Sequence, residues 1–245
     1  MLSYIAKIKE LIDRIEAVET DGIRQAAGWV ADALENGHAI YVFGASHASI
    51  LSQELFYRAG GLLPVTPIFG REIMLDTAPV TKTSQMEQLE GYGRILANSY
   101  PLAAGDVLLI HSVSGRNPVA IDLALAAREK GVRLIAVTNR TYSASVSSRH
   151  SGGKKLMDLC DLVLDNHGEI GDACCSVEGL PVKVGASSTV TGCLIANAVM
   201  VEAVEQIQKN KKIPAPVFYS ANLDGGAEKN QELFERFRRQ IHYEF

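Results

Sequence analysis

The sequence of 245 residues predicts an α/β fold: a three-layer αβα sandwich on a five-stranded, doubly wound parallel sheet, with extra N- and C-terminal helices. Two observations predict this class. Short unbroken apolar runs, typical of strands covered on both faces, alternate with segments of helical periodicity. A strand, a helical segment and a second strand form a unit that closes as a right-handed crossover in a parallel sheet. The expected strands are residues 39–43, 65–69, 107–110, 133–137 and 161–164.

The first 36 residues predict two helices ahead of the sheet. The apolar residues of the first helix recur three or four apart, at Ile5, Ile8, Ile12, Ile15 and Val18. Thr20 or Asp21 can cap a second helix, which should end near Asn36 and Gly37. The apolar stripe packs either on the sheet or on another subunit, and the sequence leaves both open.

The segment between the first and third strands predicts two more helices. One is expected from about residue 48 to residue 59, and residues 74–84 are loop-like. Ser84 then opens a Ser-x-x-Glu capping box with Glu87, which predicts the start of the next helix. Glu87 and Glu90 are three residues apart and should therefore share one face of that helix.

Residues 106–139 carry the most distinctive pattern: a strand, a serine-rich loop, a helix and a second strand. Asn117 can cap the helix, and Pro118 suits its first turn, where a missing N–H costs nothing. The free N–H groups and the positive end of the helix dipole then favour an anion. The hydroxyls of Ser112 and Ser114 add donors, and Gly115 lets the backbone approach a ligand. An ordinary capped turn would use the same residues, so both interpretations stay open.

Beyond the fifth strand, Ser187, Ser188 and Thr189 predict the cap of a long apolar helix over residues 190–208, and a charged helix follows near the end of the sequence. No internal repeat or low-complexity linker divides the sequence, so we expect one domain over residues 1–245. Its parts are the leading helices, the core sheet unit, and the C-terminal helices with a loop that completes the site, at residues 1–36, 37–168 and 169–245.

Polar loops follow the carboxyl ends of all five expected strands, at residues 44–47, 70–72, 112–117, 138–140 and 165–167. Ligands of doubly wound sheets bind outside these ends, near the point where the strand order reverses. The loops therefore predict one ligand site along a single edge of the sheet.

Two of these loops resemble those of a known family. Residues 112–115, Ser-Val-Ser-Gly, followed by a polar residue and a helix, resemble the phosphate loop of the sugar isomerase (SIS) domain family. Residues 40–46, a strand with a glycine and a serine, are similar to the first strand and loop of that family. The resemblance covers roughly residues 37–165 and implies a flavodoxin-like sheet and a sugar phosphate as small-molecule ligand. Family members usually carry threonine where this chain has Asn117.

The resemblance and the loop positions give a set of candidate site residues. The expected substrate-binding residues are Ser46, Ser112, Ser114, Gly115, Asn117, Asp165, Asn166, Ser187, Ser188 and Thr189. In the family a glutamate on the helix after the second strand commonly acts as base, which implies Glu90 or Glu87 here. A family histidine assists ring opening, which implies His47. Each serine can instead be a structural cap or turn residue, and Glu87 can merely complete the capping box.

The implied function is binding of a phosphorylated sugar and its aldose–ketose isomerisation by a carboxylate base. Two alternatives stay open: a phosphosugar-binding sensor without catalysis, and a sugar-phosphate lyase or etherase that releases lactate. Leading helices often join a dimer in this family, so the resemblance also implies a homodimer.

Composition and missing motifs exclude other classes. A net charge of −4 favours neither nucleic acid nor an anionic membrane, and no apolar run reaches the length expected of a bilayer span, so we expect a cytoplasmic protein. The four cysteines lack CxxC spacing, which predicts free thiols and no metal. No GxGxxG follows the first strand, and neither a GxSxG elbow nor a P-loop is present, so no cofactor is expected.

Overall fold

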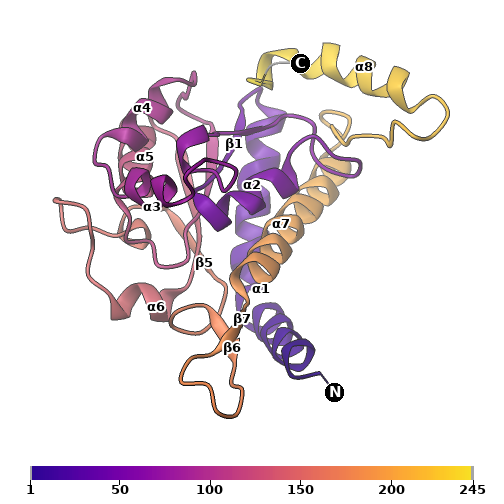
Figure 1. Cartoon of the computed structure of the whole chain (residues 1–245). Coiled ribbons are helices and arrows are strands. Elements are labelled where there is room, and N and C mark those ends of the chain that lie inside the picture. Colours follow the sequence, from indigo (N-terminus) through magenta and orange to yellow (C-terminus); the bar gives the residue numbers. More distant parts are fainter. Residues whose placement is uncertain (1, 244–245) are drawn as a thin grey trace.

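A parallel five-stranded sheet lies between two layers of helices in the computed structural model, which describes residues 2–243 (Figure 1). The strands follow the order β2-β1-β3-β4-β5, and all neighbours are parallel. This is the flavodoxin-like order, so the predicted fold class is confirmed. The strands are β1 (Ile40–Gly44), β2 (Val65–Pro67), β3 (Val107–His111), β4 (Arg133–Thr138) and β5 (Leu162–Asp165).

Eight α-helices surround the sheet within the described residues. They are α1 (Ser3–Glu35), α2 (Ser49–Leu55), α3 (Thr81–Glu87), α4 (Tyr92–Asn98), α5 (Pro118–Glu129), α6 (Arg140–Ser145), α7 (Ser188–Asn210) and α8 (Gly226–Phe237). Four short 3₁₀ turns join them, η1 (Ser46–Ala48), η2 (Arg71–Ile73), η3 (Leu156–Asp158) and η4 (Arg238–Gln240).

The core has one apolar half on each face of the sheet, because successive strand residues point to opposite sides. On β3, Leu109 packs with residues of α1, α2 and α7. Its neighbours Leu108 and Ile110 pack with α4 and α5 on the other face. In Figure 1, α1 and α7 run side by side although they come from opposite ends of the chain. The sequence predicted both apolar layers from the same alternation of strands and helices.

The leading segment is one continuous helix and not two. α1 runs unbroken from Ser3 to Glu35, and Thr20, the expected cap, lies in its middle. The Thr20 hydroxyl donates to the Glu16 carbonyl one turn earlier, so it satisfies the helix instead of ending it. Asp21, the alternative cap, also lies inside α1, and the glycine that follows it at position 22 does not break the helix.

The prediction that a helix starts at Ser84 is also wrong. Ser84 lies inside α3, which ends at Glu87, and a left-handed Gly91 with φ of 87° precedes α4. Glu90 therefore lies in the turn between the two helices and does not share a helix face with Glu87. The helix expected over residues 48–59 is shorter as well, because η1 precedes α2 and α2 ends at Leu55.

Three elements were not foreseen with these bounds: two strands and a short helix. A small antiparallel pair, β6 (Ala173–Cys175) and β7 (Val184–Ala186), projects beside the start of α1, where the Tyr4 hydroxyl donates to the Ala186 carbonyl at 2.7 Å (Figure 1). The short helix α6 is capped by Asn139, whose side-chain oxygen accepts from the Tyr142 N–H.

The four cysteines are free thiols, as predicted.

The sequence predicted no segment long and apolar enough to cross a membrane, but one helix meets these criteria. Among residues 2–243, α7 alone is long and apolar enough, by length and composition, to cross a bilayer. Its residues Ile195, Val199 and Ile207 are buried in the core against α1 and the sheet. The core helix of a globular fold meets the same criteria, so this feature is weak evidence for a membrane span.

Candidate functional site

A cleft of about 260 Å³ opens at the carboxyl edge of the sheet, where the loops after β1 and β3 face the end of α3. β1 has β2 on one side and β3 on the other, so the cleft lies at the reversal of strand order. Six predicted site residues line it: Ser46, His47, Glu87, Ser112, Ser114 and Asn117.

Several carbonyls of the loop of residues 112–117 are bonded to neighbouring segments of the chain. The carbonyls of Gly115 and Arg116 accept from the N–H groups of Leu156 and Arg149, both at 2.9 Å. Among the described residues, nothing accepts from the N–H of Ser114 or of Gly115. These donors and the start of α5 form an arrangement suited to an anion.

Gly115 serves packing more than ligand approach. It is buried with φ of 60°, and a Cβ there would lie 3.2 Å from the Leu156 Cβ. The loop therefore needs a glycine at this position whether or not a ligand is bound.

Asn117 is the residue before α5 and Pro118 is the first residue of the helix, as predicted, but the Asn117 side chain does not cap the helix. Its Nδ2 donates to Glu87 Oε2 at 2.7 Å, and its Oδ1 accepts from Arg149 Nη1 at 2.9 Å. The side chain thus links the cleft wall to a cation instead of satisfying the first turn. The expectation that it caps the helix is wrong.

Glu87 is half-buried at the end of α3 and lines the cleft. Burial raises the pKa of its carboxyl, while the hydrogen bond from Asn117 and the charge of Arg149 pull the pKa the other way. A carboxyl with a raised pKa exchanges protons nearer neutral pH, which suits a general base or acid.

Glu90 lies outside the cleft and is exposed. Its carboxylate accepts from the Ser151 N–H and, at 2.7 Å, from the Ser151 hydroxyl. The Ser151 hydrogen bonds lower the pKa of the Glu90 carboxyl, in contrast to that of Glu87. Of the two candidate bases, the structure brings only Glu87 to the predicted loops.

The loop after β1 is tightly turned at the cleft. Ser46 has a left-handed backbone with φ of 54°, a conformation that is sparsely populated for serine. A Cβ on Gly44 would lie 2.2 Å from the Ala48 carbonyl oxygen, so only glycine permits this turn. His47 is exposed at the mouth of the cleft.

The predicted binding residues after β5 lie elsewhere. The Asp165 carboxylate accepts from the His167 N–H at 2.9 Å, and the Asn166 side chain accepts from Asn139 Nδ2 at 3.1 Å. Glu19 of α1 bonds to His167 Nε2 at 2.9 Å. These contacts fasten the end of β5 to α1 and α6, so the polar residues hold the loop.

The serines before α7 meet a carboxylate that does line the cleft. Asp172 accepts from the N–H groups of Ser187 and Ser188, at 3.1 and 2.8 Å, and from the Ser188 hydroxyl at 2.6 Å. Its carboxylate therefore occupies the positive end of α7. Ser187, Ser188 and Thr189 are not among the residues that line the cleft.

His111 and Tyr142 also line the cleft and were missed. His111 is buried at the end of β3, with Nδ1 3.2 Å from the Ala48 carbonyl oxygen. Burial lowers the pKa of its imidazole, which is therefore neutral near pH 7. The polar residue that ends the apolar run 107–110 was the available signal. Tyr142 gave none, because it stands in a serine-rich stretch.

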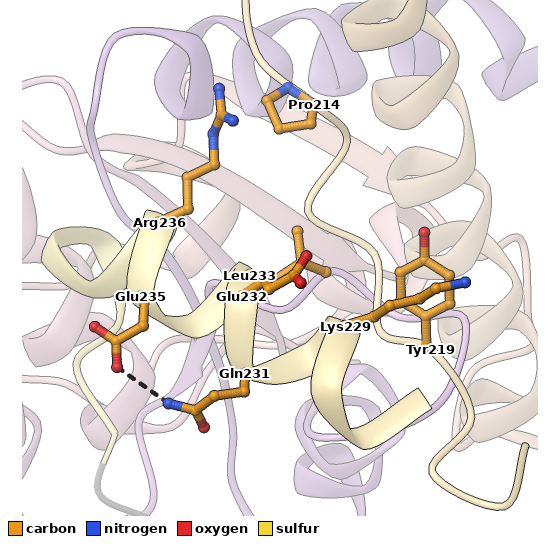
Figure 2. A pocket seen from close by; sticks show the side chains of 8 residues that line it. All are labelled: Pro214, Tyr219, Lys229, Gln231, Glu232, Leu233, Glu235 and Arg236. Carbon is orange, nitrogen blue, oxygen red and sulfur yellow. Dashed lines mark hydrogen bonds between the residues drawn. The ribbon is translucent and has the colours of Figure 1, made fainter. Parts of the chain in front are cut away.

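A larger hollow, of about 900 Å³, lies along α8 (Figure 2). There Lys229 lies 4.8 Å over the ring of Tyr219, and Gln231 Nε2 donates to Glu235 at 3.0 Å. No predicted site residue and no strand end of the sheet lies in it. We therefore place the candidate site at the smaller cleft.

Comparison with known proteins agrees with the fold. Residues 3–139 match the family model described as SIS domain. A UPF0309 protein of Shouchella clausii is 49% identical over 99% of this chain and 100% of its own length. A UPF0309 protein of Oceanobacillus iheyensis is 48% identical over 99% of this chain and 98% of its own.

Two solved structures share the architecture at low sequence identity. The phosphoheptose isomerase of Neisseria gonorrhoeae has a TM-score of 0.55 and 20% identity, and the match covers 82% of this chain and 95% of that one. The phosphoheptose isomerase of Francisella tularensis has a TM-score of 0.55 and 17% identity, with 82% and 94% covered. This likeness shows the fold.

Proposed function

Because this chain belongs to the SIS-domain family, we propose that its cleft binds a phosphorylated sugar and isomerises it between aldose and ketose forms, with Glu87 as the base. One observation carries the proposal. The same cleft joins a serine loop with free N–H donors to a half-buried carboxyl whose pKa is raised. The serine loop suits a phosphate, and the Glu87 carboxyl suits proton transfer.

In this proposal the phosphate lies on residues 112–117. The hydroxyls of Ser46, Ser112 and Ser114 and the N–H groups of the loop donate to its oxygens, and the start of α5 adds a favourable dipole. Glu87 then removes the proton from the carbon beside the carbonyl, and the hydroxyl proton of that carbon moves to the carbonyl oxygen. Glu87 next protonates the former carbonyl carbon, with a proton that can exchange with solvent in between. His47, at the mouth, donates to the sugar oxygens during ring opening.

The proposal predicts a selective thermal shift. A sugar phosphate at about 100 times its dissociation constant should stabilise the protein by roughly 2.7 kcal/mol. We expect one member of a panel of sugar phosphates to raise the melting temperature more than inorganic phosphate does. Ser114→Ala should lose most of that shift, because it removes a donor of the phosphate loop.

Ser99→Ala is the matched control, since the Ser99 hydroxyl donates to the Ile95 carbonyl at the end of α4, away from the cleft. Equal shifts in Ser114→Ala and Ser99→Ala would contradict the phosphate assignment. A selective ligand that is never converted would favour the sensor, and lactate release would favour the etherase.

We further propose that the protein is a homodimer joined through α1 and α7. An apolar groove of about 540 Å³ runs between these helices, lined in part by Ile12, Ile23 and Leu194. Val201 of α7 lines this groove and leaves 58% of its surface exposed. Such contiguous apolar surface is typical of an interaction site.

Val201→Glu should therefore convert a dimer to a monomer in light scattering. Ile95→Glu is the control, because Ile95 is equally apolar and 63% exposed but lies on α4 in the other helix layer. A monomeric wild type, or a Val201→Glu protein that stays dimeric, would contradict the interface.

We also infer that residues 1–245 act as one cytoplasmic unit. The packing of α1 against α7 supports the first part, since it joins a helix before the sheet to a helix after it on one face of the sheet. The four free thiols support the second part, because reduced cysteines are usual in the cytosol.

A further inference from the structure

Residues 148–151, called the strap here, cross the start of α5 beside the cleft. The Arg149 N–H donates to the Arg116 carbonyl of the phosphate loop at 2.9 Å. His150 Nε2 lies 3.2 Å from Asp122 Oδ1 on α5, and Ser151 bonds to Glu90. Successive residues of the strap are thus fixed to the loop, the helix and the turn before α4.

This anchoring places the Arg149 guanidinium at the rim of the cleft. Its Nη1 donates to Asn117 Oδ1, and its charge acts on the cleft carboxyl of Glu87. Arg149 is exposed and forms no ion pair with a described residue. A guanidinium has five N–H donors, so most of its donors remain available to a ligand.

The phosphate loop presents no cation to the cleft, because its one charged residue, Arg116, is not among the residues that line the cleft. Its hydroxyls and N–H groups are neutral donors, while a phosphate monoester carries nearly two negative charges near neutral pH. Charge-assisted hydrogen bonds from arginine to phosphate are stronger than neutral ones and match its geometry. A charged partner at the rim would therefore complete the set of donors.

We propose that Arg149 binds the phosphate group of the ligand and that Asn117 positions it. This rests on the proposed function. It also accounts for asparagine where the resembled family usually has threonine. The amide donates to Glu87 and accepts from Arg149 at the same time, which a threonine hydroxyl is too short to span. Asn117 therefore fixes the Glu87 carboxylate and the Arg149 guanidinium relative to each other.

Glu90 has a defined part in this arrangement. Its carboxylate holds Ser151, while Asp122 holds both His150 and the Gly91 N–H. The turn before α4 and the strap are therefore fastened to the same stretch of α5. Glu90 is a positioning residue for Arg149, which is a role different from that of the base.

The test titrates inorganic phosphate and glucose 6-phosphate into the full-length protein by calorimetry. Arg149→Gln should weaken both about 10- to 100-fold and should reduce the dependence of affinity on salt. The affinity of Arg149→Lys should lie between those of wild type and Arg149→Gln, because lysine keeps the positive charge but loses the forked geometry of the guanidinium. Glu90→Gln should weaken binding less, and it should add nothing in the Arg149→Gln background.

Arg140→Gln is the matched control, since Arg140 is exposed, donates to the Val163 carbonyl and lies outside the cleft. If Ser114→Ala weakens phosphate but Arg149→Gln binds it like wild type with the same salt dependence, the Arg149 proposal is overturned and the proposed function stands. If wild type binds neither probe, both are overturned. Melting temperatures without ligand verify that each variant folds.

Discussion

Glu87→Gln is expected to lower kcat by about 10²- to 10⁴-fold, the usual contribution of a general base. The change keeps the shape of the side chain, and its amide oxygen can still accept from Asn117 Nδ2. The dissociation constant of the sugar phosphate should therefore stay within a few-fold of wild type. Single-turnover assays and calorimetry on the same protein separate the two effects.

The raised pKa of Glu87 also predicts a pH dependence. Only the ionised carboxylate is a base, so kcat/KM should rise with pH through a pKa above the usual carboxyl value of about 4.3. This limb should be absent in Glu87→Gln. Burial favours the neutral form in the folded protein, so the stabilising contribution is full at low pH and is lost as pH rises through the raised pKa. Above it, Glu87→Gln should melt higher than wild type.

Glu232→Gln is the control for both measurements, because Glu232 lies on α8 beside the remote hollow of Figure 2. It should match wild type in turnover and in its pH profile. Full turnover in Glu87→Gln would remove this carboxyl from the chemistry and leave the phosphate site untouched.

Of the substitutions proposed for this protein, Gly93→Ala should lower the free energy of unfolding most. A Cβ on Gly93 of α4 would lie 2.0 Å from the Val119 carbonyl oxygen and 2.7 Å from the Asp122 Cβ, both on α5. The two helices must separate to admit it, and overpacking of this kind costs about 1–3 kcal/mol or more. For a chain of this size the melting temperature should fall by about 3–10 °C. Phosphate affinity should fall too, because α5 carries the loop and the strap.

Gly28→Ala is the matched control, since Gly28 is also helical but its nearest contact would be Gln206 Oε1 at 3.4 Å. Alanine is favoured over glycine in a helix by roughly 0.5–1 kcal/mol, so this variant should be as stable as wild type or more stable. If Gly93→Ala melts like Gly28→Ala, the close approach of α4 and α5 is contradicted.

The fold was predictable because its signals are local and repeated. The central strands β3 and β4 are built on apolar runs, and residues 130–131 end α5 with a basic residue and glycine, as predicted. Helix boundaries were harder. Thr20 looked like a cap, and Ser84 with Glu87 looked like a capping box, yet both threonine and serine lie inside helices. A capping residue is informative only when the chain also stops being helical there.

The site was predictable where loop chemistry alone decides, as in residues 112–117. The choice between Glu87 and Glu90 was not, because it depends on contacts with Asn117 and Ser151, which lie 30 and 61 residues away in the chain. Polar residues at strand ends also have two uses. Asp165 looked like a ligand group but holds its own loop, and only the packed structure separates these uses.

Isomerisation by Glu87 is tested most directly by hydrogen exchange at the sugar. The protein is incubated in D₂O with the sugar phosphate that gives the selective thermal shift, and deuterium at the carbon beside the carbonyl is followed by NMR. We predict deuterium incorporation with wild type, none with Glu87→Gln, and wild-type incorporation with Glu232→Gln. A ligand that binds wild type but gains no deuterium and forms no isomer would contradict the account and leave the protein a sensor.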